Sequence, residues 1–154
     1  MALLIAARYH VVIFRFPTPT ALAQSSHHER TMPEVTWDHI HLRSPDPEAT
    51  ATWLRDVLGG EIVRGPGRTD VRLGGASIFI AKVEPGDGID PPPATPHQGL
   101  DHFGLAVKDI DAVAAELKAK GVTFTTEPTT IRPGVRICFI RGPQDISIEL
   151  LERD

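Results

Sequence analysis

Two histidines at matching positions in two similar stretches of the chain could share one metal ion. His39 lies within residues 37–42 (WDHIHL) and His102 within residues 100–105 (LDHFGL), and an aspartate follows each histidine seven positions later. Neutral imidazole is the most common metal ligand among side chains. The repeated phrase therefore predicts a metal site built across an internal duplication.

A strand must present the first of these histidines. Residues 36–43 alternate in the manner of a half-buried strand, which places His39, His41 and Arg43 on one face. Trp37 shares this face and is expected to line the core or a cavity, whereas Asp38 belongs to the opposite face. His41 could act as a further ligand, a general base or a hydrogen-bonding partner of a ligand, and an ordinary cavity histidine is an equal alternative.

A helix and three further strands complete the first unit, which spans residues 36–84. Asp46 can cap a helix that starts at Pro47, and Gly59 ends this helix after Leu58. Strands are expected near residues 61–65, 69–73 and 77–83, because glycine-containing turns separate these apolar runs.

The second unit, residues 100–154, repeats this order. Residues 100–107 predict a strand, and Asp109 can cap an amphipathic helix over residues 110–120. Further strands are expected near residues 122–126, 129–132, 135–140 and 146–152. The two units are joined by residues 85–99, a proline-rich and extended linker in which His97 is expected to be solvated.

The composition excludes several classes of protein. The chain has 154 residues, a net charge of -4 and one cysteine. Because Lys and Arg do not cluster, we expect no nucleic-acid partner. A single cysteine excludes an intrachain disulfide and a cysteine-rich zinc module. Cys138 lies in an apolar run and is expected to be a small buried side chain.

Residues 1–35 are expected to form a disordered extension ahead of the two units. Arg8, His10 and Arg15 interrupt its apolar stretch, so no run approaches the roughly 20 residues that span a bilayer. We therefore expect a cytoplasmic protein without membrane association. Residues 21–23 resemble a weak secretory cleavage site, and export is the less favoured alternative.

With its two units aligned, the chain resembles the vicinal-oxygen-chelate superfamily over residues 36–153. The resemblance rests on residues 38–46, 100–109 and 142–150. The superfamily includes glyoxalase I, methylmalonyl-CoA epimerase, extradiol dioxygenases and bleomycin resistance proteins. It implies an α+β fold of two paired βαβββ modules, whose curled mixed sheets surround a metal cavity. One such scaffold carries several chemistries, so the fold specifies the reaction poorly.

The resemblance also implies the members of the site. Its ligand positions correspond to His39, His102 and Glu149, a set that suits one divalent ion of Fe, Mn, Zn, Ni or Co. Glu149 or His41 could act as the base. In glyoxalase I an arginine four residues after the first-strand ligand binds a substrate carboxylate, and Arg43 matches that spacing; a planar guanidinium suits such an anion.

Departures from the family patterns leave the reaction open. In the alignment of the two units Ala81 occupies the position of Glu149. The usual fourth ligand of glyoxalase I falls at this position, and alanine cannot coordinate a metal. The tyrosine of extradiol dioxygenases falls near Phe139, and their additional histidine is missing. We expect a metal-dependent isomerase or lyase of the glyoxalase type, whose metal would stabilise an enediolate or enolate of a small anionic substrate with vicinal oxygens. An extradiol-type Fe(II) dioxygenase and a non-catalytic ligand-binding or resistance protein are the alternatives.

A homodimer is the expected assembly. The two modules could pair within one chain or swap between the two chains of the dimer, because the proline-rich linker can hold them together or apart. The sequence leaves both arrangements open.

Overall fold

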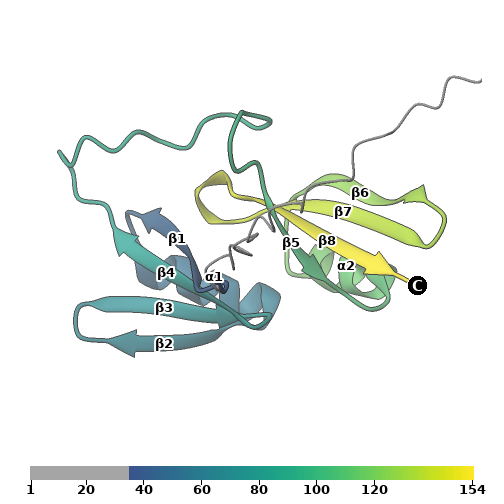
Figure 1. Ribbon diagram of the computed structural model, residues 1–154, viewed down its shortest axis with the longest axis horizontal. Coiled ribbons are helices and arrows are strands. Elements are labelled where there is room, and N and C mark those ends of the chain that lie inside the picture. The colour runs from purple at the N-terminus through teal and green to yellow at the C-terminus, as the bar shows by residue number, and fades with distance from the viewer. Residues whose placement is uncertain (1–34) are drawn as a thin grey trace, which may run out of the picture. The chain divides into compact units, whose positions relative to one another are not determined.

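The computed structural model describes residues 35–154, and the extension and cleavage site expected in residues 1–34 lie outside this part. The described residues form two four-stranded mixed sheets, each with one α-helix (Figure 1). The order βαβββ occurs twice along the chain. The predicted α+β fold of two paired βαβββ modules is therefore confirmed.

The first module places its first and last strands side by side. It comprises β1 (His39–Ser44), α1 (Pro47–Leu58), β2 (Glu61–Gly65), β3 (Arg68–Leu73) and β4 (Ala76–Lys82). Its strand order is β1-β4-β3-β2, and β1 runs parallel to β4 while the other neighbours are antiparallel. This topology brings the histidines of β1 beside the side chains of β4.

The second module repeats the topology of the first. It comprises β5 (Phe103–Ala106), α2 (Ile110–Ala119), β6 (Phe124–Arg132), β7 (Val135–Arg141), the 3-10 turn η1 (Pro143–Asp145) and β8 (Ser147–Arg153). Its strand order is β5-β8-β7-β6, with β5 parallel to β8. His102 immediately precedes β5 and therefore lies beside β8.

Strand β6 corrects one expectation. The sequence predicted two strands, near 122–126 and 129–132, but residues 124–132 form a single edge strand. Its pairing with β7 shifts register between Phe124 and Thr126 and again between Thr126 and Thr129. Pro128 has no N–H to donate, and an edge strand with bulges tolerates such a residue without ending. The prediction of a break was wrong for this reason.

Both helices begin at the predicted caps. The carboxylate of Asp46 accepts a hydrogen bond from the backbone N–H of Ala49 at 2.9 Å, and that of Asp109 accepts from Ala112 at 3.1 Å. Gly59 follows α1 with φ of 74°, a left-handed conformation that favours glycine. The caps fix the point at which the chain leaves each histidine-bearing strand.

Each helix covers one face of its own sheet (Figure 1). The buried residues under α1 include Leu54, Val71 and Ile78, and those under α2 include Ile140 and Ile148. Trp53, Leu58 and Leu105 pack against both groups, which joins the two modules in one apolar core. The opposite face of each sheet is left to carry polar and site residues.

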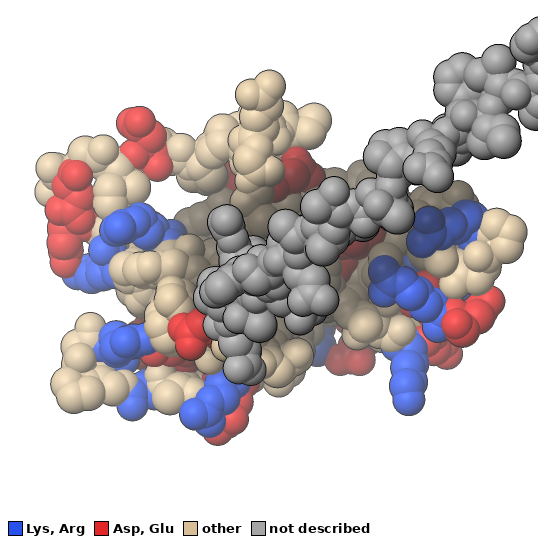
Figure 2. Space-filling view, in the orientation of Figure 1, with Lys and Arg blue, Asp and Glu red and all other residues tan. Residues whose placement is uncertain are grey.

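The described surface mixes charges of both signs. Basic and acidic side chains are interspersed over the face seen in Figure 2. None of the helices within residues 35–154 is long and apolar enough to cross a bilayer. Trp37, expected in the core or a cavity wall, is instead 71% exposed because it precedes β1.

Candidate metal centre

The second module brings His102 and Glu149 together. His102 Nε2 lies 3.6 Å from Glu149 Oε2, which is too long for a hydrogen bond. Two donors that each lie about 2.1 Å from one ion are roughly 3 to 3.5 Å apart, so a small adjustment would let both bind the same ion. Glu149 alternates with Ile148 and Leu150, which are buried in the core, and therefore lies on the opposite face of β8.

Asp101 orients the imidazole of His102. The Nδ1 atom of His102 is 2.9 Å from Asp101 Oδ2, and this hydrogen bond holds the pKa of the Asp101 carboxyl below its usual value. A carboxylate on Nδ1 favours the tautomer that leaves Nε2 free to bind a metal. With Nδ1 bonded to Asp101, the ring presents Nε2 toward Glu149.

The first module carries the same arrangement of aspartate and histidine. His39 Nδ1 lies 2.5 Å from Asp38 Oδ2. The sequence had assigned Asp38 to the face opposite His39, which was wrong because β1 begins at His39 and strand alternation does not extend to Asp38. Each module therefore contains one aspartate–histidine pair at the start of its first strand.

Gly104 makes room for the carboxylate of Glu149. These two residues are direct partners across β5 and β8. A Cβ atom added to Gly104 would lie 3.2 Å from Glu149 Oε2, closer than an ordinary contact. The missing side chain at position 104 lets the carboxylate lie over β5 on the side of His102. Sequence reasoning had given this glycine no role.

Phe79 takes the place of Glu149 in the first module. His41, two residues after His39, pairs with Phe79, just as Gly104, two residues after His102, pairs with Glu149. The Phe79 ring stacks on His39 with centroids 4.1 Å apart and an interplanar angle of 21°.

The expected equivalence of Ala81 with Glu149 is therefore corrected. Ala81 pairs with Arg43 and lies two residues beyond Phe79 along β4. A shift of two residues keeps a side chain on the same face of a strand, so hydrophobic alternation could not reveal it. Phe79 also lacks a donor atom, and the first module thus offers no carboxylate at this position.

The three predicted ligands do not all meet within the described part of one chain. In residues 35–154 no three His, Cys, Asp or Glu side chains are arranged to hold one ion. His39 instead stacks on the Phe79 ring, and the ring centroids of His39 and His41 are 6.2 Å apart. Of the predicted ligand set, the structure joins His102 with Glu149 and leaves His39 apart.

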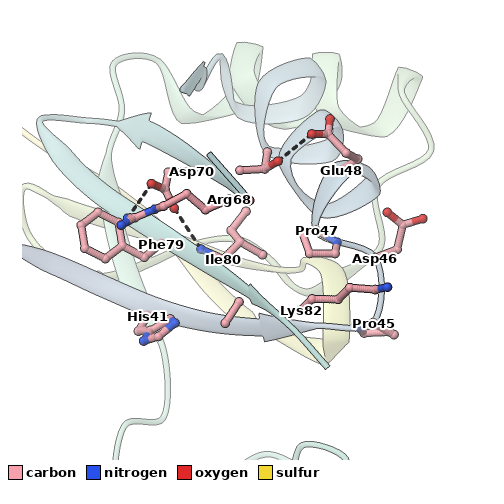
Figure 3. A pocket seen from close by; sticks show the side chains of 13 residues that line it. His41, Pro45, Asp46, Pro47, Glu48, Arg68, Asp70, Phe79, Ile80 and Lys82 are labelled. Atoms are coloured by element: carbon pink, nitrogen blue, oxygen red, sulfur yellow. Dashed lines mark hydrogen bonds and ion pairs between the residues drawn. The ribbon is translucent and has the colours of Figure 1, made fainter. Parts of the chain in front are cut away.

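A cavity of about 760 Å³ lies in the first module, and its lining includes His41, Phe79 and Arg68 (Figure 3). The Arg68 guanidinium sits 4.2 Å from the centre of the Phe79 ring, and its Nη2 lies 2.6 Å from Asp70 Oδ2. These contacts hold the guanidinium in place while some of its N–H groups remain available for an anion. Nothing in the sequence distinguished Arg68 from a surface arginine.

Arg43, the predicted carboxylate-binding residue, lines a different cavity. This second cavity measures about 520 Å³ and is formed with Pro45, Val83 and part of the linker. Of the predicted site residues, His41 lines both cavities. Two arginines, Arg43 and Arg68, are thus candidates for binding an anion near His41.

The family of the chain follows from comparison with known proteins. Residues 36–150 match the Glyoxalase/Bleomycin resistance protein/Dioxygenase superfamily, and the chain belongs to this superfamily. Two Arabidopsis thaliana proteins, "Probable lactoylglutathione lyase, chloroplastic" and "Lactoylglutathione lyase GLX1", are 28% and 23% identical to it over 124 residues. The match covers 75% of this chain but 35% and 43% of the two lyases, so the chain spans less than half the length of these relatives.

Solved structures share the fold. A glyoxylase/bleomycin resistance protein/dioxygenase domain from Frankia sp. EAN1pec is 25% identical, with a TM-score of 0.61 over 79% of this chain and 99% of that one. The virulence protein STM3117 from Salmonella typhimurium is 19% identical, with a TM-score of 0.61 over 80% of this chain and all 100% of that one. The second likeness concerns the fold alone.

Proposed function

We propose that this protein is a metal-dependent lyase or isomerase of the glyoxalase type that acts on a small anionic substrate with vicinal oxygens. The observation that carries the proposal is the 3.6 Å approach of His102 Nε2 to Glu149 Oε2. Imidazole and carboxylate donors suit a divalent ion of Fe, Mn, Zn, Ni or Co. The similarity to lactoylglutathione lyases supports the class of reaction.

His39 completes the ligand set from a second copy of the chain. Support comes from the aspartate that orients His39 as Asp101 orients His102, although His39 lies apart from the His102–Glu149 pair. Each chain thus supplies His39 to one metal site and the His102–Glu149 pair to the other. A two-fold symmetric homodimer joins them into two identical sites.

The remaining site residues handle the substrate. A bound divalent ion supplies positive charge that stabilises the anion formed when a proton leaves the substrate. A ring nitrogen of His41 accepts that proton, because His41 lines both cavities and is exposed. The carboxylate of Glu149 is the alternative base. Arg43 or Arg68 binds the anionic group of the substrate through its guanidinium.

Metal analysis tests the ligand assignment. Wild-type protein, loaded in turn with each of the five ions and then desalted, should retain about one ion per chain. His102→Ala, Glu149→Gln and His39→Ala should each lower retention strongly. Glu116→Gln is the matched control, because Glu116 is a solvent-exposed helix residue. Absence of retained metal in the wild-type protein would overturn the proposal.

Mixed dimers test the shared site. A dimer of one His39→Ala chain and one Glu149→Gln chain, purified through two different tags, contains one intact set of ligands if the sites are shared between chains. It should retain about half the metal of the wild-type dimer, whereas each parent variant retains little. If the ligands all come from one chain, both chains of the mixed dimer are defective and retention stays low.

A ligand-binding protein without catalysis is the second candidate. The observation that favours it is the cavity of about 760 Å³, whose lining includes Phe79 and Arg68 but neither His102 nor Glu149. Retained metal together with turnover of a vicinal-oxygen substrate would exclude it. The extradiol dioxygenase is not favoured. Phe139 lies near the position expected for its tyrosine and meets the His102 ring edge-on, with centroids 5.0 Å apart. Phenylalanine lacks the hydroxyl that a tyrosine would supply there.

A further inference from the structure

Two buried polar atoms without a partner lie close behind the proposed metal ligand His102. Among residues 35–154, the buried side-chain atoms that lack a hydrogen-bond partner are His97 Nδ1 and Asp101 Oδ1. Both residues line one cavity of about 170 Å³, together with His102 itself. A buried polar atom without a hydrogen-bond partner destabilises the folded state, so a partner is expected for each atom.

The linker brings His97 to this position. Arg141, in β7, donates a hydrogen bond to the side-chain hydroxyl of Thr95, which anchors the linker two residues before His97. Pro92 and Pro93 line the same small cavity. His97 is therefore partly buried, and the expectation that it is solvated was wrong because the linker packs against the second module.

One carboxylate oxygen of Asp101 already has a hydrogen-bond partner. Its Oδ2 atom accepts the hydrogen bond from His102 Nδ1. The second oxygen, Oδ1, remains to be satisfied. An imidazole N–H is a donor and a carboxylate oxygen an acceptor, so one bond between His97 and Asp101 would satisfy both atoms.

We propose that His97 is a positioning residue for the metal centre: its Nδ1–H donates to Asp101 Oδ1, and Asp101 in turn fixes His102 with Nε2 toward Glu149. The inference rests on the proposed metal site. It gives the linker a role in that site, because a linker side chain braces the carboxylate that orients a ligand. Such supporting hydrogen bonds strengthen one another in a partly buried site.

The first module provides an internal control. The side chain of Asp38 is 82% exposed, whereas that of Asp101 is 40% exposed. Water can replace the carboxylate at Nδ1 of His39 more easily than at Nδ1 of His102. Orientation by aspartate should therefore matter more in the second module than in the first.

The test uses the full chain and two measurements. His97→Ala should weaken Co²⁺ binding, measured against a competing chelator, by about tenfold. In the metal-free protein it should also shift the His102 ring away from the Nδ1–H tautomer, as read from its ¹⁵N spectrum. His97→Asn keeps an N–H near the place of Nδ1 and should restore both properties. Asp101→Ala should reduce Co²⁺ affinity more than Asp38→Ala.

Each alternative outcome is distinct. An unchanged tautomer and unchanged affinity in His97→Ala would overturn the role of His97. Equal losses in His97→Ala and His97→Asn would also overturn it, because they would mean that only packing was lost. If the wild-type chain binds none of the five divalent ions, the proposed function fails, while the tautomer of His102 in the metal-free protein still decides whether His97 positions it.

Discussion

Phe79 and Glu149 occupy the same register position in the two sheets, and each contacts the histidine of its own module. Phe79 stacks on His39 at 4.1 Å between ring centroids, and Glu149 approaches His102 to 3.6 Å. The first module thus holds an aromatic ring at the position where the second module holds a carboxylate. The two halves of the proposed site have different chemistry for this reason.

Phe79→Glu should therefore create a fourth ligand position. The new carboxylate would lie beside His39 and should raise the affinity for a divalent ion by at least about tenfold, measured by competition with a chelator. Ala81→Glu is the matched control, since Ala81 pairs with Arg43 and lies two residues beyond Phe79 along β4. Equal gains in the two variants would contradict the register assignment.

Gly104→Ala should weaken metal binding without unfolding the protein. Its Cβ would lie 3.2 Å from Glu149 Oε2, so the carboxylate must move away from its present place. We expect a loss of about 10- to 100-fold in metal affinity, measured by the same competition.

Gly65→Ala is the control for the general effect of a methyl group in a strand. There the nearest atom is Arg68 Cγ at 3.5 Å, an ordinary contact. Both variants should unfold at denaturant concentrations close to that of the wild-type chain. A comparable loss of metal affinity in Gly65→Ala would remove Gly104 from the site.

Cys138 should resist thiol reagents in the folded protein. The side chain is fully buried, and burial raises the pKa of its thiol to about 11. At pH 8 only about one thiol in a thousand is then ionised, and the thiolate is the reactive form. A chromogenic disulfide reagent should label the chain within minutes in guanidinium but not in buffer. Rapid labelling of the native protein would refute the assignment of Cys138 to the core.

The pair of Asp111 and Arg136 should contribute to stability at neutral pH and not in acid. Arg136 donates two hydrogen bonds to the Asp111 carboxylate, at 2.6 and 2.8 Å, and holds the pKa of Asp111 below its usual value of 3.8. Since the folded state has the lower pKa, the contribution is complete above about pH 4 and is lost as the pH falls through the lowered value.

Asp111→Asn should therefore destabilise the chain at pH 7 and make little difference at pH 2. Urea midpoints at both pH values measure this effect, which should be small because the pair is exposed to solvent. Asp90→Asn is the control, since Asp90 forms no ion pair within residues 35–154. A larger effect of Asp111→Asn in acid than at neutral pH would contradict the sign.

Local features of the chain could be predicted from sequence because short-range physics decides them. The caps at Asp46 and Asp109 and the shared face of His39, His41 and Arg43 follow from periodicity and hydrogen bonding within a few residues. The duplication itself was visible in the repeated histidine phrase. The sequence predicted strand structure on both sides of Pro128 but not its continuity in β6, because that continuity depends on pairing with β7.

Relationships between distant segments required the tertiary structure. The register of β1 on β4 decides that Phe79, not Ala81, lies beside His41, and no local pattern carries that information. The burial of His97 depends on linker packing against the second module, and the orientation of Arg68 depends on Phe79 and Asp70. Within the strands that formed, the sequence by itself therefore determined which residue types share a face. Only the tertiary structure decided which of them meet, because contacts between segments are set by packing and register rather than by neighbours along the chain.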